Sequence, residues 1–522
     1  MLTKNKRIFH ILLIGILGFI VYSNTFNVPF IFDDEFSITR NPVIRNLDNF
    51  FFKQEGYSDN PGRYIGFLTF AINYKLGGLN VAGYHIFNLL VHIVNTILVY
   101  IMIILTFRTP NMKDSCLIPF SDLIAIFAAV LFVAHPIQTQ AVTYTVQRFA
   151  SLATMFYLFA IVLYARMRIF QESGKLSSKK VFMLFFLSLA MIVLAMKTKE
   201  IAFTLPIIIT LYEFFFFRSA IRKRITFLTP VILTLLIIPV GILNVHKPVG
   251  TIISDVSEMA NAQASISRVD YLLTQFSVII TYIRLLFFPV NQTLDYDYPV
   301  YHSLFTPRVF ISFLVLLCLF CISIFLLIRS RRGSDSGNRI IAFGMLWFFV
   351  TLSVESSVIP IADVIYEHRV YLPSIGFFVA LVTFLILVKN SLEKRGLRAG
   401  YVIVPTLVMA VLTFSIAAYA RNNIWKDDIR FWEDVVKKSP FKARTHSNLG
   451  VVYGRKKLFE EAIKEFQTAI RLDSFYPVAH YNLGNIYGKQ GRFEEAIEEL
   501  KTAIKLSPEY AVPHQNLGVI YG

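Results

Sequence analysis

Long apolar runs recur along most of this 522-residue chain. A helix needs about 20 predominantly apolar residues to cross the hydrocarbon core of a bilayer. Runs near that length continue to about residue 419, and one further apolar stretch, 272–288, contains Gln275 and Arg284. The pattern predicts eleven membrane spans, at 8–26, 85–107, 120–135, 142–165, 181–196, 201–217, 225–243, 308–328, 340–354, 370–388 and 400–419.

From about residue 440 the pattern becomes amphipathic and repeats itself. The segments SNLGVVYG, YNLGNIYG and QNLGVIYG recur at a spacing of 34 residues, starting at 447, 481 and 515. The stretch EEAIKEFQTAIRL returns as EEAIEELKTAIKL with the same spacing. This period is typical of tetratricopeptide (TPR) repeats, which bind peptides or proteins on a concave face. We therefore predict a helical repeat array over 426–522.

The sequence ends inside the first helix of a third repeat. A lone helix of this kind cannot bury its apolar face, so we expect further repeats in the full protein. The segment 430–440 resembles a degenerate leading half-repeat. His446, His480 and His514 fall in register, and their position favours repeat packing over a metal site.

Composition supports a membrane protein and argues against a nucleic-acid partner. The chain is 55% hydrophobic and 16% charged, with a mean hydropathy of +0.57, whereas soluble domains contain about 25% charged residues. Its net charge of +17 is gathered in short collars between spans, as expected of cytoplasmic loops. Three cysteines, two of them inside a span, imply no disulfide framework. The collars lie at 4–7, 166–180, 218–224, 329–339 and 389–398.

The basic collars also predict the orientation. A crossing at 272–288 would place the basic loop 329–339 outside, so we predict a re-entrant or interfacial helix there. Eleven spans put the N-terminus in the cytoplasm and 426–522 on the outer side. The first span lacks a signal-peptide cleavage site and is expected to be retained. The outer segments are then 27–84, 135–141, 197–200, 244–271, 289–307 and 354–369.

A carboxylate cluster follows the first span, in the sequence NTFNVPFIFDDEFSITRNP. Asp33, Asp34 and Glu35 could simply form a solvated cap. Two adjacent carboxylates also repel each other, which can raise the pKa of one of them and make it a better general base. Ionisable residues at membrane boundaries are costly and often mark reaction sites. On the residues alone, both interpretations stay open.

Several stretches resemble the transmembrane-and-TPR protein O-mannosyltransferases and their bacterial relatives, in the GT-C superfamily of glycosyltransferases that use lipid-linked sugars. FDDEFSITRNPVIRNL is similar to that family's Asp-Asp loop, and RYIGFLTFAINYKLGGLNVAGYHIFNLLVHIVNT is similar to the run after it. AHPIQTQAVTYTVQRFASLATMFYLFAIVLY, KTKEIAFTLPIIITLYEFFF and EHRVYLPSIGF are similar to later segments. The resemblance covers nearly the whole chain. Tyr64 departs from it, since the family usually has proline after the arginine.

The resemblance implies an all-α bundle of GT-C type over 1–425, with its first outer loop at 27–84, followed by the TPR solenoid. It implies transfer of a hexose, with mannose favoured, from a polyprenyl-phosphate sugar to Ser or Thr hydroxyls of proteins that the repeats bind. Asp33 matches the catalytic aspartate, which would take the proton of the acceptor hydroxyl. Asp34 matches the second acidic position.

The leaving lipid phosphate gains charge as the glycosidic bond breaks, and fixed cations stabilise that charge. Arg369, flanked by Glu367 and His368 in YEHRVYLPS, is the first candidate for this role. Further cations could act there or be ordinary snorkelling residues at the interface. The remaining candidates are Arg148 and Lys199 for the phosphate, and Arg63 and Glu35 for the acceptor or sugar.

The resemblance requires no metal or other cofactor, although Asp33 and Asp34 could bind a divalent cation. His85 and His92 share one helix face, where packing is favoured over metal binding. The sequon NQT at 291–293 carries little weight in a bacterial protein.

Two other functions stay open. The chain could be a non-enzymatic membrane anchor whose TPR repeats recruit partners, or a GT-C transferase that acts on a glycan or lipid. An anchor needs neither the FDDE nor the EHR cluster. We expect an integral multi-pass protein of the bacterial cytoplasmic membrane with a periplasmic site, or of the endoplasmic reticulum membrane with a lumenal site if the source is eukaryotic.

Overall fold

The spans and the repeats belong to different structural units. One unit, called the membrane unit below, comprises Met1–Val290 and Val300–Asn422, and the other, the repeat unit, comprises Asn291–Pro299 and Asn423–Gly522. Every regular element in the described residues is a helix, which confirms the predicted all-α fold. Much of the predicted outer loop 244–271 lies outside the described residues. The computed structural model describes residues 2–53, 55–174, 177–242, 266–332, 336–357 and 359–522.

The membrane unit consists of long apolar helices. Among the described helices, nine are long and apolar enough to cross a bilayer, or ten if one bent pair counts as a crossing. Two segments of the predicted eleven spans, 201–217 and 340–354, form the shorter helices α10 and α16. This set of helices indicates a multi-pass membrane protein. The bounds are α1 Leu2–Tyr22, α5 Val81–Thr106, α6 Ser121–Ala134, α8 Arg148–Ser173, α9 Ser178–Met196, α10 Leu205–Phe216, α11 Ile221–Leu233, α12 Ile237–Ile242, α14 Arg268–Phe287, α15 Pro307–Arg332, α16 Ser336–Leu352, α17 Tyr371–Glu393 and α18 Gly400–Ile424.

Short helices fill the turns between the long ones. In the first outer loop, which the sequence places at 27–84, a five-residue π-helix is followed by a 3₁₀ turn and three α-helices. Other single turns of 3₁₀-helix start or end the spans. The short elements used below are η1 Glu35–Thr39, α2 Asp48–Phe51, α4 Tyr64–Gly77, η4 Pro136–Gln138, α7 Thr139–Val142, η5 Thr145–Gln147, η6 Glu200–Thr204 and η8 Glu367–Val370.

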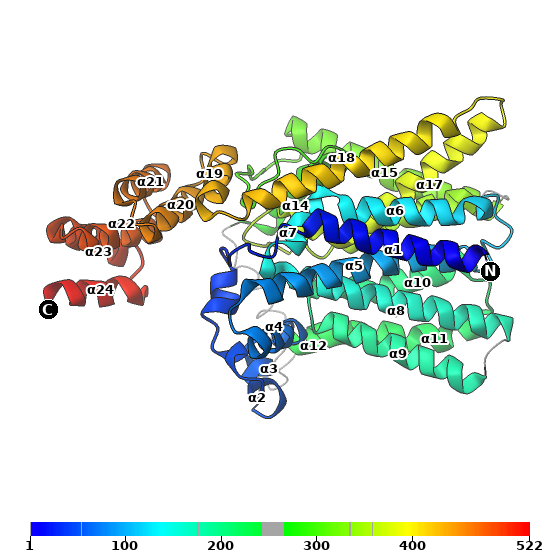
Figure 1. Cartoon of the computed structure of the whole chain (residues 1–522), viewed down its shortest axis with the longest axis horizontal. Coiled ribbons are helices and arrows are strands. Elements are labelled where there is room, and N and C mark those ends of the chain that lie inside the picture. Colours follow the sequence, from blue (N-terminus) through cyan, green and yellow to red (C-terminus); the bar gives the residue numbers. More distant parts are fainter. Residues whose placement is uncertain (1, 54, 175–176, 243–265, 333–335, 358) are drawn as a thin grey trace. The chain divides into compact units, whose positions relative to one another are not determined.

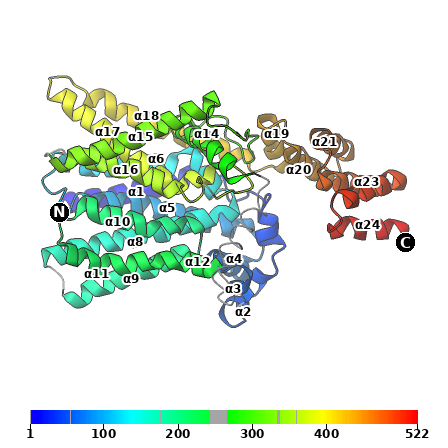
Figure 2. The ribbon, with the colours of Figure 1, turned by 180° about the vertical axis from the view of Figure 1, so that it is seen from behind.

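Neighbouring helices of the membrane unit lie lengthwise against one another (Figure 1 and, from behind, Figure 2). α5 packs against α1, α6 and α8, and α8 packs against α9. The backbones of α16 and α17 touch where Gly344 faces Gly376. A Cβ atom added at Gly344 would lie 2.5 Å from the carbonyl oxygen of Gly376. Only glycine allows this approach, which brings the two helices into direct van der Waals contact.

The segment 272–288 forms α14, an unbroken helix of 20 residues. Its length and composition alone would allow it to cross a bilayer. However, Tyr271, Gln275 and Tyr282 donate side-chain hydrogen bonds to successive carbonyl groups of one connecting segment, 355–366. Figure 1 shows α14 at the same end of the bundle as α7. The re-entrant or interfacial placement of this helix stays a prediction.

Near the C-terminal end of α8, a buried carboxylate of α10 faces cations from α8 and α11. Arg168 Nη2 lies 2.8 Å from Glu213 Oε1, and both side chains are fully buried. The Tyr164 hydroxyl donates to the same carboxylate, and Arg224 lies 3.8 Å from it. These cations come from collars that the sequence assigns to the cytoplasmic side.

The repeat unit is built from helix pairs. α20 packs on α21 and α22 on α23, and α19 packs on α20. Gly450 allows the close approach within the first pair, since a Cβ atom there would lie 2.7 Å from the ring of Phe466. Phe466 and Leu483 belong to one buried core that spans consecutive pairs. The bounds are α19 Asp428–Lys438, α20 Ala443–Arg455, α21 Phe459–Leu472, α22 Pro477–Lys489, α23 Phe493–Leu506 and α24 Ala511–Tyr521.

The segment 291–299 is part of the repeat unit, although the sequence predicts it as part of an outer loop. Asp295 is 1% exposed. Arg444 grips its carboxylate with two hydrogen bonds of 2.7 Å, and Lys442 reaches the same group. The hydroxyl of Ser439 donates to the Asp295 carbonyl. These contacts fix the segment on the start of α20.

Two of the three repeated histidines, His446 and His480, each join the two helices of a pair. His446 Nδ1 lies 2.6 Å from Glu465, and His480 Nδ1 lies 2.6 Å from Glu499. The other ring nitrogen of each histidine faces a backbone carbonyl six residues upstream. Both nitrogens therefore face acceptors, an arrangement that suits a protonated ring. The hydrogen bond to the glutamate raises the pKa of both histidines.

We predict that the repeats become less stable as the pH rises. The folded array holds its histidine protons more tightly than the unfolded chain, so this stabilisation is complete below the ordinary pKa of 6.5 and is lost as the pH rises through the raised value. Glu499→Gln should cost about 1 kcal/mol at pH 6, after allowance for solvent screening.

Hydrogen exchange of α22 and α23 in the intact protein, corrected for intrinsic exchange rates, measures this loss. Glu498→Gln, a change at an exposed neighbouring carboxylate, is the control. Equal protection of wild type and Glu499→Gln at pH 6 would contradict a charged His480.

Candidate functional site

Distant parts of the chain meet at the end of the membrane unit where α1 ends and α5 begins, which we call the site end. Asn24, in the link after α1, donates to the carbonyl of Tyr419 near the end of α18 at 2.8 Å. His85, near the start of α5, lies 2.8 Å from the carbonyl of Val28 in the same link. The N–H of Ile65 in α4 donates to the carbonyl of Lys197 at the end of α9 at 3.0 Å.

The acid pair is held rigidly at this end. Phe32, just before it, has a φ of +55°, a left-handed conformation that costs a residue with a side chain about 1–2 kcal/mol. Asp34 is 1% exposed, and its two carboxylate oxygens accept the backbone N–H groups of Ile31 (3.1 Å) and Val146 (2.7 Å). Asp33 is only half-buried. Strained residues that the surroundings hold in place are common at functional sites.

Burial makes the two aspartates chemically different. Removal from water raises the pKa of Asp34 to about 8, and the neighbouring charge of Asp33 adds to the shift, while the two amide hydrogen bonds and Arg148 oppose it. The backbone N–H of Asp33 donates to the hydroxyl of Tyr144 (2.9 Å). Burial raises the pKa of Tyr144 well above 10, so this phenol stays neutral. Asp33 is thus the member of the pair that an incoming hydroxyl could reach.

A buried bend between α6 and α8 supports the acid pair. The axes before and after His135 differ by 52°. The imidazole of His135 accepts the N–H of Ile137 at the break and faces the carbonyl of Leu286 with its other nitrogen. Pro136 lacks the N–H that a continuous helix would need. The chain is therefore turned back at the site end and not carried across.

Polar side chains of the bend segment, 135–148, reach three other elements. Gln138 donates to Ser374 on α17 at 3.0 Å. The side-chain oxygen of Gln140 accepts the backbone N–H of His368 at 2.7 Å. The same segment supplies Tyr144 and Val146 to the acid pair. It therefore links the aspartates to the Glu-His-Arg turn through short contacts.

The Glu-His-Arg turn, η8, is buried. Glu367 is fully buried, and Arg421 of α18 lies 3.2 Å from its carboxylate. His368 stacks on the ring of Tyr366, with ring centres 5.2 Å apart. Arg369 is 4% exposed and donates to the carbonyls of Asp363 and Val364 and to the hydroxyl of Tyr271. All three predicted residues thus lie on one anchored turn.

The hydrogen-bond partners of the buried Arg369 guanidinium differ from those of the buried Arg168. The hydrogen-bond acceptors of Arg369 among the described residues are all neutral, and no carboxylate of these residues lies within ion-pair distance of it. Arg168 shows the usual alternative, a buried guanidinium against a carboxylate. An uncompensated buried charge is costly, and an anionic ligand would remove that cost. Arg369 therefore suits an anion-binding site.

Arg148 is enclosed more completely. It is fully buried and donates to Asn88 (2.7 Å), Asn73 (2.6 Å) and the carbonyl of Tyr84 (3.1 Å). The ring of Phe70 lies 4.5 Å from its guanidinium. These neutral acceptors tie α4 and α5 to the start of α8. Arg148 is thus an anchor of the first outer loop, and its predicted contact with a phosphate stays a prediction.

The other predicted residues form ion pairs around the same end. Lys199 is paired with Glu355 at 2.8 Å, and both side chains are mostly buried. Arg63 lies 3.4 Å from Glu200, with both side chains about two-fifths exposed. Glu35, in η1, is paired with Arg40 in the same loop.

Sequence reasoning missed several residues that complete this arrangement. Tyr144, Gln140, Tyr271 and Arg421 contact predicted residues but come from other parts of the chain. Only Arg421 carried a signal, as a cation in the last turn of an apolar helix. Tyrosine and glutamine have no special spacing that would distinguish them.

The acid pair offers limited room for a metal. Both oxygens of Asp34 already accept N–H groups, whereas a cation needs those lone pairs. No group of three or more potential protein ligands occurs in the described part of the chain. A need for a divalent cation stays untested.

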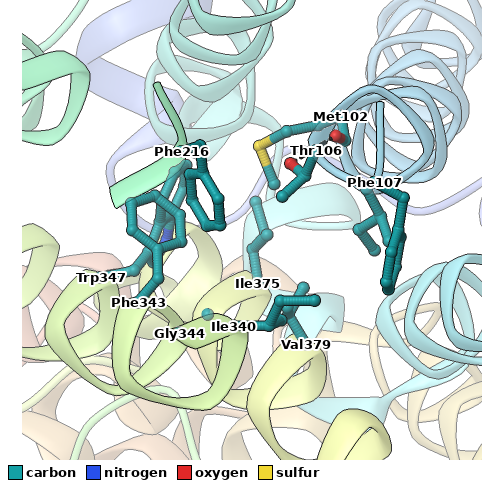
Figure 3. A pocket seen from close by; sticks show the side chains of 12 residues that line it. Met102, Thr106, Phe107, Phe216, Ile340, Phe343, Gly344, Trp347, Ile375 and Val379 are labelled. Carbon is teal, nitrogen blue, oxygen red and sulfur yellow. Dashed lines mark hydrogen bonds between the residues drawn. The ribbon is translucent and has the colours of Figure 1, made fainter. Parts of the chain in front are cut away.

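A small pocket elsewhere in the membrane unit is apolar. Figure 3 shows it between α5, α10, α16 and α17, with Met102, Phe216, Trp347 and Val379 among its walls. Thr106 also lines it, and its hydroxyl donates to a carbonyl of its own helix. None of the predicted site residues lines this pocket. A charged sugar phosphate would find no fixed cation there.

Comparison with known proteins identifies the repeats. A TPR repeat family model matches residues 458–491 and 484–522. The crystal structure of the APC/C hetero-tetramer Cut9-Hcn1 covers 90% of this chain and 86% of its own at 15% identity, but its TM-score of 0.21 establishes no shared fold. The chain is thus a polytopic helical membrane protein with TPR repeats.

Relatives of this chain share the name protein O-mannosyl-transferase, and two of the three that follow are similar over most of the chain. Protein O-mannosyl-transferase F38B6.6 of Caenorhabditis elegans is 27% identical over 86% of this chain and 60% of its own length. Protein O-mannosyl-transferase TMTC3 of Homo sapiens is 24% identical over 82% and 47%. Tmtc1 of Drosophila melanogaster is 32% identical over 31% and 18%. The chain is a distant relative of these proteins, which confirms the resemblance, and it spans about half the length of those it matches.

We predict that the membrane unit loses stability as the pH rises from about 4 to about 8. Folded Asp34 keeps its proton up to a pKa of about 8, whereas the unfolded chain releases it near the ordinary 3.8. The folded state therefore binds more protons across this window, and its free energy of unfolding falls by up to about 1.4 kcal/mol per pH unit.

Asp34→Asn should flatten this dependence. Thermal unfolding of the purified protein in detergent at pH 5 and pH 8 measures it, with the exposed Asp48→Asn of the same loop as control. An unchanged pH dependence in Asp34→Asn would show that Asp34 titrates normally.

Proposed function

We propose that this chain is a membrane glycosyltransferase of GT-C type. It moves a hexose, with mannose as the first candidate, from a polyprenyl-phosphate sugar to Ser or Thr hydroxyls of protein acceptors. The observation that carries the proposal is the buried guanidinium of Arg369, whose hydrogen-bond acceptors among the described residues are neutral, at the end of the bundle that also holds a half-buried aspartate. The shared name of the relatives supports the reaction type.

Asp33 acts as the general base in this proposal. An alcohol is a weak nucleophile, and a carboxylate that accepts its proton as attack develops lowers the barrier. The strained turn at Phe32 and the bond from Asp33 N–H to Tyr144 fix the position of this carboxylate. Asp34 serves as the anchor, since its oxygens are occupied by amide groups. Attack on the face opposite the phosphate inverts the anomeric centre.

Arg369 binds the departing phosphate. Its planar fork can donate two parallel hydrogen bonds to phosphate oxygens. Lys199 is coupled to it through Glu355, whose carbonyl accepts from the Tyr271 hydroxyl that faces Arg369. Glu367 cannot accept a hydrogen bond from a phosphate anion, so we assign it to hold the turn. Arg148 acts at a distance by fixing the loop.

The acceptor binds through the repeats in this proposal, and the site end faces away from the cytosol. Stacked TPR helices present a groove to an extended chain, which suits protein segments with accessible hydroxyls. Arg63 and Glu35, on the first outer loop, are candidates for contact with the acceptor or sugar. No metal takes part in the steps proposed for these residues.

The alternative hypothesis, a non-enzymatic scaffold, predicts a different outcome for changes at the same residues. An anchor would tolerate neutral changes at Asp33 and Arg369 and would be sensitive only to changes in the repeats. The anchored turn and the strained aspartate loop serve no purpose in an anchor. We therefore favour the transferase.

Asp33→Asn should abolish transfer while leaving the protein folded. The amide keeps the size of the side chain but cannot accept the proton, which should lower kcat by about a hundredfold or more. The assay supplies membranes with a panel of radiolabelled polyprenyl-phosphate sugars and follows label into protein. Asp48→Asn, an exposed change in the same outer loop, is the control. Label that enters lipid or glycan instead would assign a different acceptor, and full activity of Asp33→Asn would remove the proposed base.

Arg369→Lys should retain the protein fold and weaken use of the donor. Lysine keeps the charge but loses the fork, so we expect kcat/KM for the sugar donor to fall by about tenfold or more, and further in Arg369→Gln. Arg218→Gln, at an exposed cation outside the site, is the control. Equal kcat/KM values for all three variants would exclude Arg369 from phosphate binding.

A further inference from the structure

The buried carboxylate of Glu367 pairs with a cation from the last helix of the membrane unit. Arg421 Nη2 lies 3.3 Å from one oxygen of Glu367 and 3.2 Å from the other. Glu367 is fully buried and Arg421 is 9% exposed. A carboxylate in such surroundings needs a positive neighbour to stay ionised. Arg421 supplies that charge to the first residue of η8.

The position of Arg369 depends on this pair. η8 is a single turn of 3₁₀-helix, too short to fix itself by its own hydrogen bonds. Contacts to other elements hold it, among them the N–H of His368, which donates to the side-chain oxygen of Gln140, and the ion pair between Glu367 and Arg421. Arg369 follows Glu367 by two residues, so a displaced Glu367 also displaces the guanidinium that we assign to the phosphate.

The next residue along α18 extends the same anchor. Asn422 is fully buried. Its side-chain nitrogen donates to the carbonyl of Val21 at the end of α1, and its oxygen accepts from the hydroxyl of Thr143 in the bend segment. The end of α18 is therefore bonded to the turn, to the bend and to the helix that precedes the acid pair.

We propose that Arg421 is a positioning residue for the donor phosphate. It neutralises Glu367 and holds the Glu-His-Arg turn so that Arg369 meets the phosphate, without touching the substrate itself. This inference rests on the proposed function of the site and adds a residue to it that the sequence did not single out.

A purely structural ion pair would have a different signature, and the chain contains a matched example. Arg168 and Glu213 form a second buried pair at 2.8 Å in the same unit. Arg168 lies 20 residues after Arg148 on α8, which places it about 30 Å along the helix from the site end. Loss of that pair should affect folding alone.

The experiment compares Arg421→Gln with Arg168→Gln in the full chain, in membranes supplied with polyprenyl-phosphate mannose. Both variants remove an arginine from a buried carboxylate, Glu367 in one case and Glu213 in the other. Arg421→Gln should raise the KM for the donor about tenfold or more, with a smaller change in kcat, because an unpaired Glu367 carboxylate repels the phosphate and releases the turn. Arg168→Gln should lower the amount of folded protein and leave the donor KM within about twofold.

Neutralising both partners supplies the sharper test. Glu367→Gln combined with Arg421→Gln removes the unpaired charge, so its donor KM should lie closer to wild type than that of Arg421→Gln alone. Arg421→Lys, which keeps the charge, should also recover part of the loss. A double variant as impaired as the sum of both single variants, or equal donor KM values for Arg421→Gln and Arg168→Gln, would overturn the proposal.

Binding of polyprenyl phosphate without a sugar separates this inference from the proposed function. Wild type that neither transfers nor binds this lipid would refute the proposed function. Wild type that binds it, with Arg421→Gln binding equally well, would refute the positioning role alone. We expect the variant to bind about tenfold more weakly or worse, in line with the change in KM.

Discussion

A chain that turns back inside a helical bundle must satisfy the polar groups of the turn, and this constraint organises the membrane unit. The bend at 135–148 is buried, so water cannot satisfy its polar groups. Its side chains and amides bond instead to α17, η8, α18 and the loop after α1. Together these hydrogen bonds hold three distant stretches of the chain, namely η8 with α17, α18 and the loop after α1, against the bend.

The charges at that end are arranged unequally. Most cations there have a carboxylate within ion-pair distance, as Lys199 has Glu355 and Arg421 has Glu367. Arg369 and Arg148 are surrounded by neutral acceptors instead. Arg148 is enclosed by rings and amides, which suits a structural role. Arg369 is the cation that an anionic substrate could stabilise. We therefore assign phosphate binding to Arg369 and anchoring of the outer loop to Arg148.

The sequence predicted those features that depend on local pattern. Apolar run length predicted most of the long helices, and the 34-residue period predicted the repeats. The catalytic role of the carboxylates after the first span stays a prediction. Charge along the chain also predicted a re-entrant or interfacial helix at 272–288, which stays a prediction.

Features that depend on tertiary contacts were not predictable in this way. No spacing shows that Arg421 faces Glu367 across 54 residues, or that Asp34 accepts an amide from Val146. The segment 291–299 resembles any polar loop, yet it belongs to the repeat unit because Asp295 meets Arg444. Such pairings follow from how helices pack, which hydropathy does not encode.

The central claim is that one donor molecule is held between the half-buried aspartate and the Glu-His-Arg turn. An experimental structure of the protein with a bound polyprenyl-phosphate sugar measures this directly. The account predicts the phosphate within hydrogen-bond distance of the Arg369 guanidinium, and the anomeric carbon of the sugar turned toward Asp33. A phosphate bound elsewhere, with Arg369 still contacting only its neutral neighbours, would contradict it.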